Sequence, residues 1–345
     1  MLARDLPLWA DVSIFLLASA VIGVAGAKMA GYADRIADRT GLGEAVTGMV
    51  FLGLLTALPG LAASVTAALQ GHPALAISNA MGGIAMQTVA LAIADIAYRK
   101  ANLEHAAASA ANMMQAAMLV LLLTIVVTSL SGPSVTLGHV HPGTVVLFLA
   151  AGLAFYAVHR TGRYPMWRPR RTRETVEDEP APGHQIESLP FLAAALLIAG
   201  GLTLVAGVVI AEVAAHVVVE TPISETVVGG LFMAVATSLP ELVTCVAAVR
   251  RGALTLAVSN IVGGNFFDVL FVAAADAVYF SGSLYHGEGV GHREMFLTSL
   301  AVLLNIVLLA GLIYRQKGGP GKIGVESVAM LALYVGGFVI LWWWM

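Results

Sequence analysis

Two carboxylates stand inside apolar stretches of the sequence. Glu241 follows Pro240 in ATSLPELVTC, residues 236–245, and Asp268 lies in SNIVGGNFFDVL, residues 259–270. A carboxylate near the centre of a bilayer costs at least a few kcal/mol and by default marks a functional site. Because carboxylate oxygens bind hard cations and protons, Glu241 and Asp268 are the first candidates for a cation site.

A proline break accompanies Glu241 and recurs earlier in the chain. Proline cannot donate the backbone hydrogen bond of a helix, so Pro240 leaves the carbonyl of Ala236 without its helical donor. Pro59 does the same for the carbonyl of Leu55. At membrane depth such a carbonyl must find another donor, a water or a cation. Hydroxyl oxygens stand beside the two breaks on Thr56, Thr237 and Ser238. The sequence therefore predicts two helix breaks that are rich in oxygen.

The two breaks belong to an internal repeat. Residues 44–95 align with residues 225–276 without a gap, at a constant offset of 181 residues (225 − 44). Two segments rich in Ala, Leu and Val match by chance at apolar positions, but matched Pro, Asn and Gly residues in one register indicate duplication. The matched pairs include Thr56 and Thr237, Pro59 and Pro240, Asn79 and Asn260, Gly82-Gly83 and Gly263-Gly264, and Asp95 and Asp276.

The elements that must position these groups are transmembrane helices. Of the 345 residues, 59% are hydrophobic and 11% charged, and the mean hydropathy of +0.86 lies far above soluble-domain values. A helix that spans a bilayer needs about 20 mostly apolar residues. The sequence therefore predicts an all-α polytopic membrane protein with about ten transmembrane helices. The expected spans are roughly 8–29, 44–69, 74–98, 106–131, 142–159, 189–216, 225–250, 254–280, 294–314 and 323–344.

The basic residues predict how the chain crosses the membrane. Lys and Arg follow the odd-numbered spans, at positions 28–39, 99–100, 160–173, 250–251 and 315–322. The positive-inside rule places these loops in the cytoplasm and both termini outside. A cleavable signal peptide in IFLLASAVIGVAGA is disfavoured, because the basic residues follow this apolar run instead of preceding it. We therefore expect a multi-pass protein of the inner (plasma) membrane, with the lipid bilayer and no nucleic acid among its partners.

The two copies of the repeat carry opposite topological signals. The uncharged turn Leu69-Gln70 aligns with the basic turn Arg250-Arg251, and five spans, an odd number, separate the copies. This is an inverted repeat, a common construction for secondary transporters whose ion site lies at the midplane. The expected organisation is a five-helix half at 1–159, a cytoplasmic linker at 160–188 and a second five-helix half at 189–345.

These repeats resemble the α-repeats of the cation/Ca²⁺ exchanger superfamily, and are nearest to its Na⁺/Ca²⁺ exchanger branch. The motifs TSLPELVT and SNIVGGNFFDVL of the second copy follow the pattern of that family closely. The resemblance implies alternating access, in which the first and sixth helices slide against the rest. It also implies that Glu241 and Asp268 are the acidic ligands. The further oxygen ligands that it implies in the second copy are Thr237, Ser238 and the carbonyl of Ala234.

The first copy departs from the family pattern. Gly60 stands where a second glutamate is expected, Ala57 takes the serine position of TSLPE, and Gln87 aligns with Asp268. The ligands that remain in this copy are Thr56, the carbonyl of Gly53 and the amide oxygen of Gln87.

The charge of the site leaves more than one ion possible. Two carboxylates balance one Ca²⁺, two Na⁺ or two protons, and losing a third acid weakens a divalent site more than a monovalent one. The favoured function is a Na⁺/Ca²⁺ exchanger-like antiporter with no resident cofactor. The alternatives are a sodium/proton or other cation/proton antiporter, or a transport-deficient homologue that acts as a sensor or scaffold. An enzyme is disfavoured because the sequence lacks Gly-x-Ser-x-Gly and His-Glu-x-x-His motifs. No protein partner is indicated.

Overall fold

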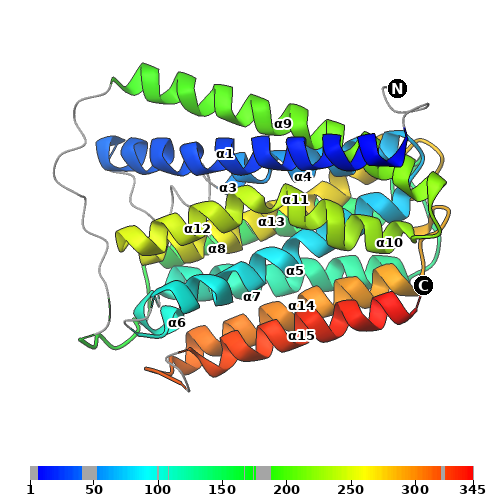
Figure 1. Ribbon diagram of the computed structural model, residues 1–345. Coiled ribbons are helices and arrows are strands. Elements are labelled where there is room, and N and C mark those ends of the chain that lie inside the picture. Colours follow the sequence, from blue (N-terminus) through cyan, green and yellow to red (C-terminus); the bar gives the residue numbers. More distant parts are fainter. Residues whose placement is uncertain are drawn as a thin grey trace.

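The protein is a bundle of helices that run along one common axis (Figure 1). The computed structural model describes residues 7–40, 53–98, 101–107, 109–166, 168–173, 175, 188–319 and 323–344. The helices before the linker are α1 (Leu8–Thr40), α3 (Gly53–Thr56), α4 (Leu58–Leu69), α5 (Pro73–Tyr98), α6 (Leu103–Ala106), α7 (Ala110–Ser131) and α8 (Pro142–Arg163). Those after it are α9 (Leu189–Glu220), α10 (Glu225–Val227), the π-helical turn η2 (Val228–Met233), α11 (Ala234–Thr237), α12 (Leu239–Arg251), α13 (Leu254–Val278), the 3₁₀ turn η3 (Leu284–His286), α14 (His292–Tyr314) and α15 (Val325–Trp343).

The described helices are long enough to cross a membrane repeatedly. Eight of them have the length and apolar character of a span, and the bent pair that runs from Glu225 to Arg250 is a ninth. Helices α3 and α4 are the described part of the predicted span at 44–69, whose first nine residues, 44–52, lie outside the described residues. The prediction of an all-α protein with many membrane spans is confirmed.

Three helices continue beyond their predicted ends. Helix α1 reaches Thr40, α8 reaches Arg163 and α9 reaches Glu220, whereas the predicted spans end at about 29, 159 and 216. In α1 and α8 helical hydrogen bonding carries on past the apolar stretch through residues that include the good helix formers Ala and Arg. In α9 the added residues 217–220 are VVVE, so the apolar stretch itself is longer than predicted. The linker expected from residue 160 therefore begins only after the last turn of α8.

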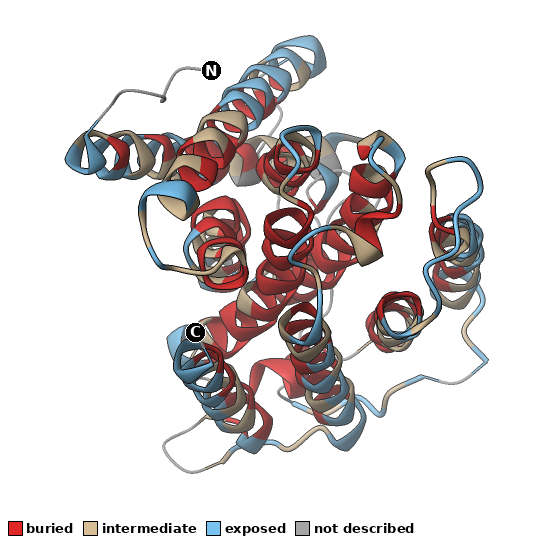
Figure 2. Ribbon diagram, turned by 90° about the vertical axis from the view of Figure 1, so that its right-hand side faces the viewer, coloured by how far each residue is buried: buried red, intermediate tan, exposed pale blue. Residues whose placement is uncertain are grey.

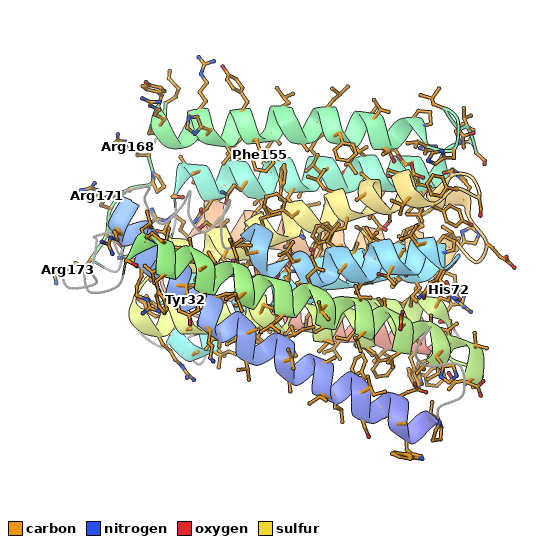
Figure 3. The ribbon with its side chains drawn as sticks, turned by 90° about the horizontal axis from the view of Figure 1, so that it is seen from above. Tyr32, His72, Phe155, Arg168, Arg171 and Arg173 are labelled. Atoms are coloured by element: carbon orange, nitrogen blue, oxygen red, sulfur yellow. The ribbon has the colours of Figure 1, made fainter. Side chains whose placement is uncertain are left out.

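The two chain ends lie on the same side of the bundle. Helix α1 begins and α15 ends at the right of Figure 1, whereas α9 begins at the left. Figure 3 shows Arg168, Arg171 and Arg173 of the linker at the left end and His72 at the opposite end. The termini and the basic linker are therefore separated by the length of the bundle, as an odd number of crossings on each side of the linker requires.

Helices α5 and α13, one from each repeat, are the most deeply buried of the eight long helices described. Figure 2 shows that the helices in the middle of the bundle are buried on nearly all sides, whereas the outer helices expose one face. In the apolar 18-residue stretch of α5, and in that of α13, 78% of the residues are buried, compared with 22% in that of α1. Glycine allows the close packing at this centre: a Cβ on Gly82 of α5 would lie 2.1 Å from the carbonyl oxygen of Gly230 in η2. Any side chain at this position would force the two elements apart.

Asp95, at the end of α5, ties three elements together. Its carboxylate accepts hydrogen bonds from the backbone N–H of Leu103 at 2.8 Å and of Gly324 at 3.0 Å. The hydroxyl of Ser327 donates a third bond at 3.0 Å. Because Gly324 and Ser327 lie at the start of α15, this one buried carboxylate holds the last helix of the second half against the first half.

Asp276, the repeat partner of Asp95, makes the equivalent contacts at the other end of the bundle. It accepts hydrogen bonds from the backbone N–H of Leu284 at 2.8 Å and of His141 at 2.8 Å, and from the hydroxyl of Thr144 at 2.7 Å. His141 and Thr144 lie at the start of α8. The two aspartates therefore fasten the fifth helix of each half in the same way, and the inverted symmetry extends beyond the aligned segments.

Helices α1 and α9 cross the proline breaks at glycines. A Cβ on Gly26 of α1 would lie 2.6 Å from the Cα of Pro240, and a Cβ on Gly207 of α9 would lie 2.4 Å from the carbonyl oxygen of Pro59. The two glycines are also repeat partners, so each of these helices lies over the break of the opposite copy.

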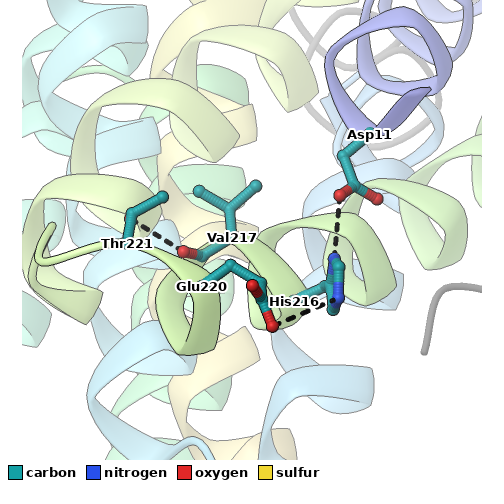
Figure 4. A network of polar contacts seen from close by, with 5 residues as sticks. All are labelled: Asp11, His216, Val217, Glu220 and Thr221. Carbon is teal, nitrogen blue, oxygen red and sulfur yellow. Dashed lines mark hydrogen bonds and ion pairs between the residues drawn. The ribbon is translucent and has the colours of Figure 1, made fainter. Parts of the chain in front are cut away.

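The same two helices are joined by a polar contact. Asp11 of α1 is fully buried, and its Oδ2 lies 2.8 Å from Nδ1 of His216 in α9 (Figure 4). Nε2 of His216 lies 4.0 Å from the Glu220 carboxylate one turn further along α9. This contact makes α1 and α9 one paired layer on the side of the bundle.

We predict that Asp276→Asn destabilises the protein, because an amide cannot accept all three of the bonds that the carboxylate accepts. The expected loss is about 2 kcal/mol, since one buried donor or acceptor is left without a partner. Thermal unfolding of the purified protein in detergent measures this loss. The exposed loop residue Glu288 supplies the control as Glu288→Gln. Equal melting temperatures for both variants would show that the Asp276 contacts do not hold α8.

A pH-dependent contribution to stability is expected from His72. Its Nδ1 lies 2.7 Å from Oε1 of Glu225, and this hydrogen bond raises the pKa of the imidazole above its usual value while burial partly opposes the rise. A raised histidine pKa stabilises the fold below the unfolded pKa of about 6.5, and that stabilisation is lost as the pH rises through the folded pKa. His72→Gln should therefore lower the melting temperature by about 1–2 °C at pH 6 and by less at pH 9. A difference that grows as the pH rises would contradict this assignment.

Candidate cation site

The proline breaks lie at Ala57 and Ser238, between the short helices α3 and α11 and the longer helices α4 and α12. Pro59 and Pro240 each fall in the first turn of the longer helix, where the missing N–H costs least. The second break bends the chain by 42°. Each break presents the carbonyl end of a helix, which carries a partial negative charge and suits a cation.

A small cavity lies where the two breaks meet α5 and α13. The residues that line it are Ala57, Gly60, Asn79, Ala80, Gly83, Gln87, Thr237, Glu241, Asp268 and Phe271. Both repeats contribute to this set, as expected of a site between inverted copies. Its two acids are Glu241 and Asp268, and the described lining includes no Lys, Arg or His to pair with them.

The two predicted acids are deeply buried in this cavity. Glu241 is fully buried and Asp268 is 3% exposed. Neither carboxylate oxygen of Glu241 has a hydrogen-bond partner among the described residues, although the hydroxyl of Thr56 lies beside this carboxylate. Buried charges without a partner are strongly unfavourable, so a carboxylate in this position requires a cation or a proton.

Gln87 joins the two repeats inside the cavity. Its Nε2 donates to Oδ2 of Asp268 at 2.6 Å and approaches the Ser238 hydroxyl at 3.5 Å. Its Oε1 is buried and accepts no bond from the described part of the chain. Two lining residues therefore provide three buried acceptor oxygens that could bind a cation, the amide oxygen of Gln87 and the two carboxylate oxygens of Glu241.

The remaining predicted ligands lie at or beside the two breaks, and Thr237 alone among them reaches the described lining. Thr237 lines the cavity, and its hydroxyl oxygen lies 3.0 Å from the carbonyl oxygen of Met233 and 3.3 Å from that of Ala234. In the first copy, the Gly53 carbonyl accepts the Thr56 hydroxyl at 3.4 Å. The structure thus brings all eight predicted residues to one place, but only Glu241, Asp268, Thr237 and Gln87 reach the lining.

Sequence reasoning missed Asn79 as a component of the site. Its Nδ2 donates to the Gly60 carbonyl at 3.2 Å and to the Ser64 hydroxyl at 2.9 Å, and its Oδ1 accepts from Thr237 at 3.3 Å. Asn79 therefore satisfies oxygens at the first break and links it to the second. The match of Asn79 with Asn260 in the repeat was the signal that could have identified it.

The glycine pairs have two different roles. Gly82 permits close packing of α5 against η2. Gly83 and Gly264 instead make room for the site, because a Cβ on Gly83 would lie 3.1 Å from Oδ2 of Asp268 and a Cβ on Gly264 would lie 2.7 Å from Oε1 of Gln87. Only a residue without a side chain leaves these polar groups in place.

Comparisons with known proteins agree with this geometry. CaxA of Alkalimonas amylolytica, named as an antiporter, is 28% identical over 328 residues, which are 94% of this chain and 96% of CaxA. The sodium/calcium exchanger MaX1 of Methanosarcina acetivorans is 30% identical over 122 residues, 35% of this chain and 32% of MaX1. A solved structure of the sodium-calcium exchanger NCX_Mj, soaked with Na⁺ and Sr²⁺, superposes with a TM-score of 0.65 at 20% identity and covers 96% of this chain and 99% of NCX_Mj. That likeness shows the same fold.

The family is shown by the sequence profile described as Sodium/calcium exchanger protein, which matches residues 11–167 and 191–343. Together these two ranges include both proline breaks, both buried acids and most of the chain. This protein belongs to the sodium/calcium exchanger family of membrane antiporters.

Proposed function

We propose that this antiporter exchanges Na⁺ for Ca²⁺ at the cavity between its inverted repeats. The observation that carries the proposal is the pair of buried carboxylates, Glu241 and Asp268, in a cavity whose described lining holds no cationic side chain. Transported cations supply the missing positive charge, so the site needs no resident cofactor. The family membership supports transport, and not catalysis, as the activity.

The proposed ligands are oxygen atoms from both repeats. Ca²⁺ takes six to eight such oxygens at about 2.3–2.6 Å. The residues that we propose to supply them are Glu241, Asp268, Thr237, Ser238, the carbonyl of Ala234, Thr56, the carbonyl of Gly53 and Gln87. Two carboxylates balance one Ca²⁺ or two Na⁺, so either ion can neutralise the same site.

Alternating access is supported by the way α1 and α9 lie across the breaks. Each contacts the opposite copy at a glycine, and the two helices are joined to each other by Asp11 and His216. Glycine lets two backbones approach closely with no side chain interlocked between them, and we infer that such a contact leaves the helices able to slide. We propose that α1 and α9 move together and open the cavity to one side of the membrane at a time.

The proposed setting is the inner (plasma) membrane, with both termini outside and residues 160–188 in the cytoplasm. The support comes from the basic residues of the linker and from their separation from the chain ends (Figure 3). The corresponding division into halves at 1–159 and 189–345 is part of the same proposal. The equivalent contacts of Asp95 and Asp276 support it.

Exchange of a cation for protons is the second candidate. Gly60 removes an acid from the first repeat, which weakens the attraction for a divalent ion more than for a monovalent one. Buried carboxylates without a fixed cationic partner also bind protons readily. Flux measurements that offer Na⁺, Ca²⁺ and pH gradients separately distinguish the two candidates.

We predict that Glu241→Gln abolishes exchange, because the amide removes a negative charge and one oxygen acceptor while it keeps the volume. Purified protein in liposomes loaded with Na⁺ should take up Ca²⁺, and the variant should lose at least about 90% of that uptake, which corresponds to a tenfold loss. Glu288→Gln, on an exposed loop, is the control for handling and orientation. Full uptake by Glu241→Gln would overturn the proposed site.

Sliding of α9 is tested at Gly207. A methyl group there would lie 2.4 Å from the carbonyl oxygen of Pro59, so Gly207→Ala should slow uptake by about tenfold, an activation cost of about 1.4 kcal/mol. Because Gly207 does not line the cavity, stabilisation of the detergent-solubilised protein by Ca²⁺ should persist. Gly201→Ala is the matched control on the same helix, since nothing lies within 4 Å of its Cβ position. Unchanged uptake in Gly207→Ala would argue against a slide at this contact.

A further inference from the structure

Phe271 forms an apolar wall of the cation cavity. It follows Asp268 by one helical turn on α13, is 3% exposed, and is the one aromatic residue in the described lining. Its ring faces Gly60: a Cβ on Gly60 would lie 3.4 Å from Cε2 and 3.7 Å from Cδ2 of Phe271. The same Cβ would lie 3.7 Å from Oδ1 of Asp268. A side chain added at Gly60 would therefore point into the site and meet the ring first.

The inverted repeat shows what this ring replaces. At the offset of 181 residues, Gly60 is the partner of Glu241 and Phe271 is the partner of Ala90. One side of the site thus combines a glutamate with a small alanine, and the other combines a glycine with a phenylalanine. The bulk missing at Gly60 is present in Phe271. The ring is in van der Waals contact with the Cβ position of residue 60, so a carboxylate there must extend past the ring to reach the site.

The replacement of a glutamate and an alanine by Gly60 and Phe271 alters the chemistry of the site as well as its packing. A phenyl ring presents no lone pair, and its bulk keeps water out of the half of the cavity beside Gly60. Ca²⁺ needs six to eight oxygens, so a wall without ligands penalises it more than an ion that is satisfied with fewer. The ring face carries a partial negative charge that attracts any cation weakly and does not replace a carboxylate.

We propose that Phe271 is a selectivity residue, which together with Gly60 closes one half of the site and lowers its preference for Ca²⁺ over Na⁺. This proposal rests on the function proposed above, in which Glu241 and Asp268 bind the transported cation. The number of carboxylates alone does not decide between Ca²⁺ and Na⁺, and the apolar side chain of Phe271 supplies a second cause of the preference. An acid restored at position 60 is then not enough to give tight Ca²⁺ binding as long as the Phe271 ring remains.

A double-mutant cycle tests the proposal on the full-length purified protein. The variants are Gly60→Glu, Phe271→Ala and the two combined, and the measured quantities are the dissociation constants of Ca²⁺ and Na⁺ by calorimetry. Each single variant should change the Ca²⁺ constant by less than about threefold, because either the ring blocks the acid or no acid is present. The combined variant should bind Ca²⁺ at least about tenfold more tightly, with a smaller change for Na⁺. Additive effects in a folded combined variant would overturn the proposal.

Phe266 provides the matched control. It lies on the same helix and is equally buried, but its ring packs against Phe155 with centroids 4.6 Å apart, away from the cavity lining. Phe266→Ala combined with Gly60→Glu should show no coupling in Ca²⁺ binding, and coupling of equal size would mean that loosened packing, and not the cavity wall, explains the effect. If the combined variant does not fold, Gly60→Asp with Phe271→Val changes the volume less and gives the same comparison.

Failure of this proposal and failure of the proposed function are distinguishable. Glu241→Gln in the otherwise unchanged protein should abolish Ca²⁺ and Na⁺ binding. If both ions still bind that variant with unchanged dissociation constants, the cavity is not the transport site, and the selectivity role of Phe271 is rejected as well. If Glu241→Gln abolishes binding but positions 60 and 271 do not couple, the site stands and only the role of Phe271 is rejected.

Discussion

The structure depends on the burial of two carboxylates that have no cationic side chain beside them. Glu241 and Asp268 lie in a small cavity at the centre of an apolar bundle, where an unbalanced charge is strongly unfavourable. That cost ties the stability of the site to the presence of cations or protons. The features around it, which include the broken helices, the glycines beside the acids and the amide of Gln87, bring oxygen atoms to the cavity without adding positive charge.

Inverted symmetry supplies the rigid frame for this site. Asp95 and Asp276 make equivalent hydrogen bonds at opposite ends of the bundle, and each fastens the fifth helix of one half. Helices α5 and α13 are deeply buried, whereas α1 is mostly exposed and α1 and α9 contact the breaks at glycines. The frame is held by buried polar bonds, and α1 and α9 meet the breaks through close backbone contacts. This difference fits the proposal that α1 and α9 move against a rigid frame.

The departures from symmetry are concentrated at the site. The frame aspartates are preserved in both copies, but Glu241 is matched by Gly60, Asp268 by Gln87, and Ala90 by Phe271. Gln87 donates to Asp268, so one copy partly satisfies the acid of the other. The two copies therefore share a symmetric scaffold and differ chemically at the candidate cation site.

Much of this protein is determined by the sequence alone. Apolar length, basic loops and the 181-residue offset predicted a multi-span helical bundle with an inverted repeat, because hydropathy and charge act locally and leave a pattern in the chain. The carboxylates of Glu241 and Asp268 could be identified because a charge in an apolar run is visible one residue at a time. The tertiary structure alone decided that Asn79 bridges the breaks, that Gly26 and Gly207 meet the prolines, and that Phe271 covers Gly60. These contacts join residues far apart in the chain, and their chemistry arises only when packing brings the two copies together.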